Sequence, residues 1–197
     1  MRISITPSND VLHRYSNQLG ALGEGAARKA LARAVNRVTT TVHGRVISAV
    51  AKQSSIPKAI VARVIKKRLA AHKGSTAIEG VVYGTGSPLP LKVFGAKQFS
   101  WGVRAKIRGR MERFPSFFIY AGTYRSGKPV GNGHVFARTT KNSLPIELQT
   151  GPSVPEEMVV GEAKRMFETT VADMLPARVQ HELWGALSGA SWAKGKG

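Results

Sequence analysis

The stretch EGAARKALARAVNRVTTTVHGRVISAVAK, residues 24 to 52, carries the strongest structural pattern in the chain. Its apolar side chains recur every three or four residues, which places them on one face of a helix. They are Ala27, Leu31, Val35, Val38, Val42, Val46 and Val50. Basic residues fall between them, at Arg28, Lys29, Arg33, Arg37 and Arg45. The stretch therefore predicts a long helix with one buried face and one basic face.

The residues on either side of this stretch predict further helices. Before it, apolar residues between positions 11 and 19 indicate a shorter helix that breaks near Gly20 and Gly23. After it, Ser55-Ile56-Pro57 is typical of a cap followed by proline in the first helical turn. We expect a second helix from Ile60 into the basic run at residues 66 to 68.

Beyond Gly74 the pattern changes to short strands separated by turns rich in glycine and proline. Strands are expected at residues 77–83, 91–94, 117–121, 134–138 and 145–149. The clearest alternation runs from Phe99 to Arg108. One face of that strand would carry Trp101, Val103, Ala105 and Ile107, and the other would carry Arg104, Lys106 and Arg108. Short strands of this kind favour a compact antiparallel sheet or sandwich.

Helix is expected again after Pro155, where Glu156 and Glu157 place negative charge at a helix N-terminus. Leu175-Pro176 is expected to break this helix, and a last helix would run to Leu187. The predicted fold class is α+β, with N-terminal basic helices, a central antiparallel β-sheet or sandwich and C-terminal helices.

We expect one compact domain with helical extensions. A basic helical region would occupy residues 1–73 and an antiparallel β core residues 74–152. The C-terminal helices at 153–188 would pack on the core, and residues 189–197 would form a flexible tail.

Positive charge dominates the composition. The chain of 197 residues has 30 Lys and Arg against 11 Asp and Glu, which gives a formal net charge of +19. The excess is uneven, because residues 1–113 contain 21 of the basic residues and only 4 of the acidic ones. A field of this size favours a polyanionic partner, most often nucleic acid, and opposes self-association unless the charge is screened.

Several classes of protein are disfavoured by the composition. The absence of cysteine excludes a disulfide framework, a thiolate metal site and a cysteine nucleophile. No apolar run is long enough to span a bilayer, and the N-terminus has no signal peptide with an apolar centre, so we expect a soluble protein made in the cytoplasm.

The segment GTYRSGKP, residues 122 to 129, nearly matches a nucleotide-binding loop. The pattern requires a hydroxyl after Lys128 to hold magnesium, and Pro129 stands there instead. Such a loop must also lead into a helix whose first amides meet the phosphates. The residues that follow are strand-like, at His134 to Arg138. We therefore predict a hairpin connection here and no nucleotide site.

Histidines and acids suggest no reaction centre. His181-Glu182 begins like the helix of a zinc protease, but Gly185 stands where the second histidine must be. The acidic residues form no obvious metal cluster. We expect a non-enzyme that needs no cofactor and no metal.

Residues 51 to 65, AKQSSIPKAIVARVI, offer a different function. They are similar to a helix-turn-helix, with Ser55 in the turn and Val61 packing inward, and would place Lys58 and Arg63 near phosphates or bases. This alternative is a sequence-specific DNA-binding regulator. Two ordinary consecutive helices with a proline-capped junction explain the same residues.

The basic clusters themselves are the candidate contacts. Few acidic residues interleave with them, which favours contact with an anion over a solvated face. Such contacts would neutralise phosphates without base readout, or would pair with acidic patches on a neighbouring subunit. The candidates are Arg63, Lys66, Lys67, Arg68, Lys73, Arg104, Lys106, Arg108, Arg110 and Arg113.

A spaced set of motifs resembles one known family. ALARAVNRV at residues 30–38 is similar to an "A-x-N-R-V" helix, and Leu89-Pro90-Leu91 precedes FPSFFI at residues 114–119. HVFAR at 134–138, LPIEL at 144–148 and GPSVP at 151–155 follow in order. Together they resemble the minor tail protein Z family of long-tailed bacteriophages, the tail completion proteins, over roughly residues 26–187. The departure is Ser116-Phe117, where that family usually has a small residue before its phenylalanine-isoleucine pair.

The resemblance implies a structural virion protein that finishes the tail so that it can join the filled head. Its partners would be other tail and neck proteins, such as the tail terminator and the head-tail connector. It would form a homo-oligomeric ring, with no membrane contact and with non-specific contact to double-stranded DNA. Its location would be the tail and neck of the virion, and the host cytoplasm during assembly.

Overall fold

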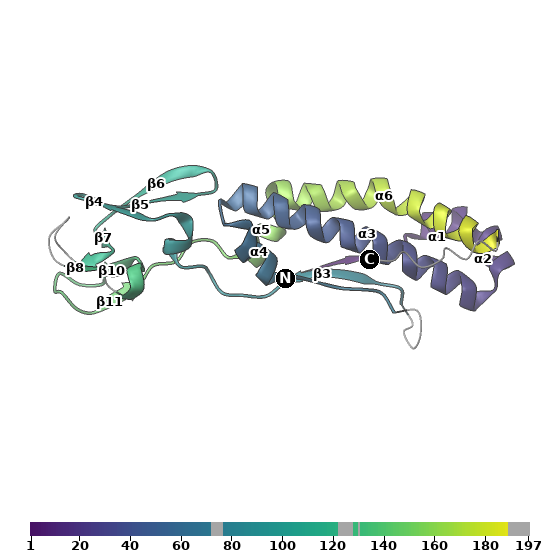
Figure 1. The fold of residues 1–197 in the computed structure, drawn as a ribbon, viewed down its shortest axis with the longest axis horizontal. Coiled ribbons are helices and arrows are strands. Elements are labelled where there is room, and N and C mark those ends of the chain that lie inside the picture. Colours follow the sequence, from purple (N-terminus) through teal and green to yellow (C-terminus); the bar gives the residue numbers. More distant parts are fainter. Residues whose placement is uncertain (72–76, 122–127, 130, 189–197) are drawn as a thin grey trace. The chain divides into compact units, whose positions relative to one another are not determined.

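The computed structural model describes residues 1–71, 77–121, 128–129 and 131–188 (Figure 1). Helices combine with several small antiparallel sheets, which confirms the predicted α+β class. The chain forms two compact units, each described below by itself. The first unit consists of Met1–Val46, Ile65–Gly84 and Lys164–Gly197, and the second of Ile47–Val64 and Thr85–Ala163. The domain division expected from the sequence stays a prediction, and its tail at 189–197 lies outside the described residues.

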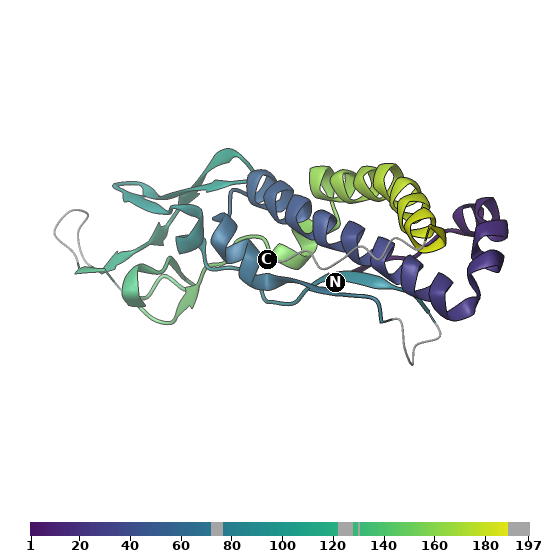
Figure 2. The same cartoon turned by 45° about the vertical axis from the view of Figure 1, so that its right-hand side comes forward.

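Helix α3 (Glu24–Ser54) confirms the helix expected at residues 24 to 52, and its residues up to Val46 belong to the first unit. Val35, Val38, Val42 and Val46 are fully buried along one face. Helix α6 (Gly161–Leu187) lies beside α3 in the first unit, as both views show (Figure 2).

Two contacts fix the direction of these two helices. Arg33 Nε donates to Glu182 Oε2 at 2.6 Å, and Arg45 Nη1 donates to Thr170 Oγ1 at 3.1 Å. Because the residue numbers rise along α3 while they fall along α6, the helices run antiparallel.

A three-stranded antiparallel sheet completes the first unit, with β3 (Gly80–Gly84) between β1 (Arg2–Ile5) and β2 (Ile65–Arg68). The backbone of β3 approaches α3 closely at Gly80. A Cβ atom at this position would lie well inside van der Waals contact with Thr39 Oγ1 and 3.0 Å from Val35 Cγ1. Thr39 is itself fixed, since its hydroxyl donates to the Val35 carbonyl at 2.7 Å. Only glycine fits between this strand and this helix.

The N-terminal part corrects two details of the prediction. The single helix expected around residues 11 to 19 is two short helices, α1 (Asn9–Arg14) and α2 (Ser16–Leu22), and α2 ends at Gly23 with φ 72°. The basic run at residues 66 to 68 is not helical, because α4 (Lys58–Val64) ends before it. Those residues belong to β2, whose pairing with β3 places Lys67 opposite Val82. Long-range pairing outweighs local helix propensity here.

The C-terminal part confirms acidic residues at a helix N-terminus and corrects the predicted break. Helix α5 (Val154–Met158) starts at Ser153, whose hydroxyl accepts from the Glu156 amide at 3.3 Å, with Pro155 in the first turn. The predicted break at Leu175-Pro176 is wrong, since α6 continues through Pro176. Leu175, Val179 and Leu183 are buried in one stripe across the proline. That burial offsets the backbone hydrogen bond that proline removes.

In the second unit the described residues form three small antiparallel sheets in place of one continuous sheet. Strands β4 (Lys97–Phe99), β5 (Gly102–Ile107) and β6 (Arg110–Pro115) form the largest, in that order. Strand β10 (Phe136–Arg138) lies between β7 (Phe117–Phe118) and β11 (Ile146–Leu148). Strands β8 (Tyr120–Ala121) and β9 (Lys128–Pro129) pair with each other, and the short 3-10 helix η2 (Gly131–Gly133) follows.

Two predicted strands in the second unit are wrong in part. Residues Leu91–Phe94 form the 3-10 helix η1, in which Val93 N donates to the Pro90 carbonyl at 2.9 Å. The two buried residues, Leu91 and Phe94, are spaced by three, which suits a 3-10 turn better than a strand. The run from Phe99 to Arg108 is divided by a turn, so Trp101 is 40% exposed and does not share the buried face of Val103.

Candidate anion-binding surface

The strand register of the β4–β5–β6 sheet gathers basic side chains on one face. Lys97 of β4 lies opposite Arg104 of β5, and Arg104 lies opposite Arg113 of β6. Residues directly opposite in an antiparallel pair point to the same side, so these three form a row across the sheet. Lys106 lies two residues after Arg104, on the same side. We call Lys97, Arg104, Lys106 and Arg113 the cationic face.

Two aromatic rings organise the arginines of the cationic face. Phe99 and Trp101 are stacked, with ring centroids 5.4 Å apart and planes within 5° of parallel. The Arg104 guanidinium lies over the Phe99 ring at 4.8 Å, and that of Arg113 lies over Trp101 at 5.3 Å. Guanidinium groups stacked in this way keep their N–H edges available for a planar anion. The stack therefore holds two cations ready for carboxylate or phosphate.

No carboxylate neutralises the cationic face within the described part of the chain. None of its four residues forms an ion pair there. The nearest acid along β6, Glu112, lies opposite Ala105 and so on the other side of the sheet. Like charges directly opposite one another destabilise a sheet. An external anion bound at the cationic face would therefore reduce the repulsion between these side chains.

Arg108, predicted as part of the same basic strand, has a different role. Its Nε atom donates to Glu157 Oε1 at 2.8 Å, and the Glu157 side chain is only 1% exposed. Gln53 Nε2 donates to the other carboxylate oxygen at 2.7 Å. The next residue, Gly109, donates its amide to Ser55 Oγ at 2.9 Å. These contacts anchor the β5–β6 turn to the end of α3 and to α5.

The other predicted contacts are dispersed. Arg110 lies on the side of β6 that faces away from Arg113, and Arg63 is exposed on α4. Lys66, Lys67 and Arg68 are exposed on β2, in the first unit. There Lys67 Nζ donates to Thr40 Oγ1 at 3.2 Å, and Arg68 lies 3.7 Å from Glu79. Lys73 lies outside the described residues.

The helix-turn-helix alternative corresponds to two consecutive helices. Helix α3 ends at Ser54, and Ser55 has φ 65°, which opens the turn before α4. Helix α4 has only seven residues and leads directly into β2. Its one buried residue is Val61, as expected for either interpretation.

The near match to a nucleotide-binding loop lies mostly outside the described residues, at 122–127. The two positions that follow, Lys128 and Pro129, form β9 opposite Ala121 and Tyr120. A strand therefore stands where a nucleotide-binding loop requires the N-terminus of a helix. The predicted hairpin joins residues 117–121 to 134–138, and β7 pairs with β10 as that prediction requires.

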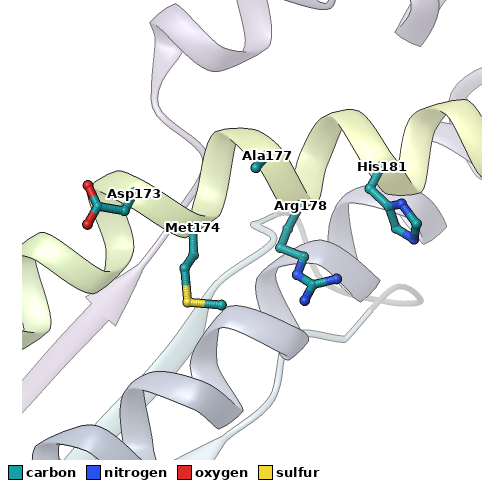
Figure 3. A pocket seen from close by; sticks show the side chains of 5 residues that line it. All are labelled: Asp173, Met174, Ala177, Arg178 and His181. Carbon is teal, nitrogen blue, oxygen red and sulfur yellow. The ribbon is translucent and has the colours of Figure 1, made fainter.

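A surface pocket of about 390 Å³ lies along α6 in the first unit (Figure 3). Its lining residues are Asp173, Met174, Ala177, Arg178 and His181. Figure 3 shows Asp173 and His181 at opposite ends, so the acid and the imidazole do not face each other. Among the residues that the structure describes, no three His, Cys, Asp or Glu side chains come together to hold a metal ion. No described helix has the length and apolar character needed to cross a membrane.

Three residues of the surface were missed by the sequence analysis: Lys97, Phe99 and Trp101. In a single continuous strand, Lys97 and Phe99 would lie on the face opposite Arg104 and Lys106, since side chains alternate along a strand. The two-residue turn at Ser100-Trp101 folds β4 back onto β5, and it was not recognised. Gly102 was the residue that could have indicated this turn. Its φ of 143° and its tight approach to the Phe114 carbonyl exclude a side chain.

One comparison with known proteins gives a match. A family model described as "Prophage minor tail protein Z (GPZ)" matches residues 12–188. No curated protein and no solved structure matches the chain significantly.

Proposed function

The chain belongs to the prophage minor tail protein Z family, and on that premise we propose that it completes the phage tail for joining to the filled head. Membership makes it a minor tail protein, with a structural role in the tail and a location in the virion. The match over residues 12–188 is the observation that carries the proposal, because it spans both units.

The proposed mode of action is non-catalytic and depends on contacts with other macromolecules. The exposed edges of the small sheets suit coverage by neighbouring subunits in a ring, or by the tail terminator and the head-tail connector. A net charge of +19 opposes assembly of isolated subunits, so an anionic partner would favour it. Acidic neighbours and double-stranded DNA both supply such charge, the second without sequence preference.

We expect deletion of the gene from its phage genome to leave filled heads and separate tails that do not join. Infectious titre should fall by orders of magnitude and return when the intact gene is supplied in trans. Electron microscopy of lysates counts joined particles, and mass spectrometry of purified particles detects the polypeptide. Joined, infectious particles from the deletion strain, or purified wild-type particles that lack the polypeptide, would exclude a tail completion role.

We also expect reversal of charge at Arg104 and Lys106 to reduce infectious titre while the protein stays folded. Both side chains belong to the cationic face and pair with no carboxylate in the described residues. Complementation of the deletion strain measures the effect, with circular dichroism as the test of folding. A matched control reverses Lys52 and Lys141, which are exposed and outside the candidate contacts, with the same change of net charge. Normal titre from the variant of the cationic face would argue against its use in assembly.

A sequence-specific regulator would behave differently in solution. It should bind one duplex sequence selectively at moderate salt, since base contacts persist when phosphate contacts are screened. A tail component should bind duplexes without selectivity, and that binding should weaken steeply as salt is added.

A further inference from the structure

Strand β6 is an edge strand that is exposed on both of its faces. Arg110, Met111, Glu112 and Arg113 are all exposed, with Met111 at 61%. Among the described residues β6 pairs with β5 alone, and Figure 1 labels it at the outside of its sheet. Its outer edge therefore presents backbone N–H and C=O groups in alternation.

The edge is held in place before any partner arrives. The turn that joins β5 to β6 is anchored by the ion pair of Arg108 with buried Glu157 and by the Gly109 amide on Ser55. The Arg108 amide also donates to the Ser54 carbonyl at 3.3 Å. An ordered edge loses little conformational freedom on binding, which favours the addition of a strand.

The side chains along β6 indicate which residue types a partner strand would carry. On the side of the cationic face, apolar Met111 and basic Arg113 alternate, and Trp101 is exposed beside Arg113. A strand added next to β6 would place one residue beside each of them. Because Met111 and Arg113 lie two residues apart on one side of β6, their complement on an added strand is an apolar residue and an acidic residue two positions apart, with one residue between them.

The same features argue against nucleic acid at this edge. Phosphate oxygens only accept hydrogen bonds, so they leave the carbonyl groups of β6 without partners. Phe99 and Trp101 stack on each other, and each also has a guanidinium over its ring. These contacts leave less ring surface on which a base could stack. An exposed methionine also suits a protein interface better than a phosphate backbone.

We propose that β6 accepts an extended acidic segment of a partner protein as an added fourth strand of the β4–β5–β6 sheet. The proposal rests on the proposed function, in which the chain acts through protein contacts. Backbone hydrogen bonds hold the segment, and its carboxylates reach Arg113 and the cationic face behind it.

A synthetic peptide that repeats Val-Thr-Glu-Thr, carrying a fluorescent label, tests the proposal by anisotropy with the full chain. We expect saturable binding and slower amide hydrogen exchange confined to residues 110–114. The same peptide with N-methyl groups on the amides of one edge keeps its charge but cannot pair. It should bind at least about tenfold more weakly, as should the unmodified peptide with Arg113→Glu. Lys141→Glu, a charge-matched change at an exposed residue outside the candidate contacts, should leave affinity within about twofold.

Five results would overturn the proposal. The N-methylated peptide could bind as well as its parent, or Lys141→Glu could lose as much affinity as Arg113→Glu. Arg113→Glu could weaken duplex DNA binding and leave peptide binding unchanged, or analytical ultracentrifugation could show self-association of the chain that Arg113→Glu abolishes. Absence of peptide binding would also reject it, while the joined-particle count of the deletion strain tests tail completion separately.

Discussion

Replacement of Gly80 by alanine should destabilise the first unit by about 3 kcal/mol or more. The new Cβ would overlap Thr39 Oγ1 and approach Val35 Cγ1 on the facing helix. Neither neighbour can yield easily, because Thr39 and Val35 are fully buried and Thr39 is bonded to the α3 backbone. The strand must therefore move away from α3, and the loss should appear in denaturant unfolding followed by circular dichroism.

Two variants control this result. Gly44 is an exposed glycine within the same helix, and a Cβ there meets open space. Gly44→Ala should leave stability unchanged or raise it by up to about 1 kcal/mol, from helix propensity. Thr39→Ala removes the closest overlapping atom and should recover part of the loss when combined with Gly80→Ala. A Gly80→Ala protein as stable as the parent would show that β3 does not pack on α3 as described.

The second large effect concerns Arg108, whose replacement by alanine should cost about 2 to 3 kcal/mol. The change leaves the Glu157 carboxylate buried with Gln53 as its remaining side-chain partner. The cost should fall at the lower end for a buried pair, since the Arg108 side chain is 62% exposed and water can take its place. Denaturant unfolding of the full chain measures it.

Arg110 provides the comparison that isolates this effect. It lies two residues away, is exposed on β6, and forms no ion pair within the described residues. Arg110→Ala should change stability by less than about 0.5 kcal/mol. Glu157→Gln combined with Arg108→Ala should recover stability, because no buried charge is then left alone. Equal costs for the two arginines would contradict the anchoring role of Arg108.

Patterns within one element were predictable from the sequence. The buried valines of α3 follow from helical spacing alone, and a helix start near Pro155 follows from that proline and the two acids after it. The α+β class and antiparallel pairing follow from short alternating strands between glycine-rich turns. Each of these depends on residues close together in the chain.

Features that depend on distant residues could not be predicted. The row of Lys97, Arg104 and Arg113 exists only because two turns set the register of three strands. Arg108 and Arg110 have similar sequence surroundings, yet of the two only Arg108 forms an ion pair with Glu157, which lies 49 residues later. The continuity of α6 through Pro176 likewise depends on burial that local propensity does not describe.

The position of Trp101 between Phe99 and Arg113 gives the molecule an optical reporter. The wavelength of indole emission depends on the polarity and charge around the ring. A partner that moves Arg113 away from the ring would therefore shift the emission maximum of Trp101. With Trp184 and Trp192 replaced by phenylalanine, the remaining fluorophore would signal occupancy of the neighbouring strand in real time. Stopped-flow mixing would then give the rates of arrival and departure without any attached dye.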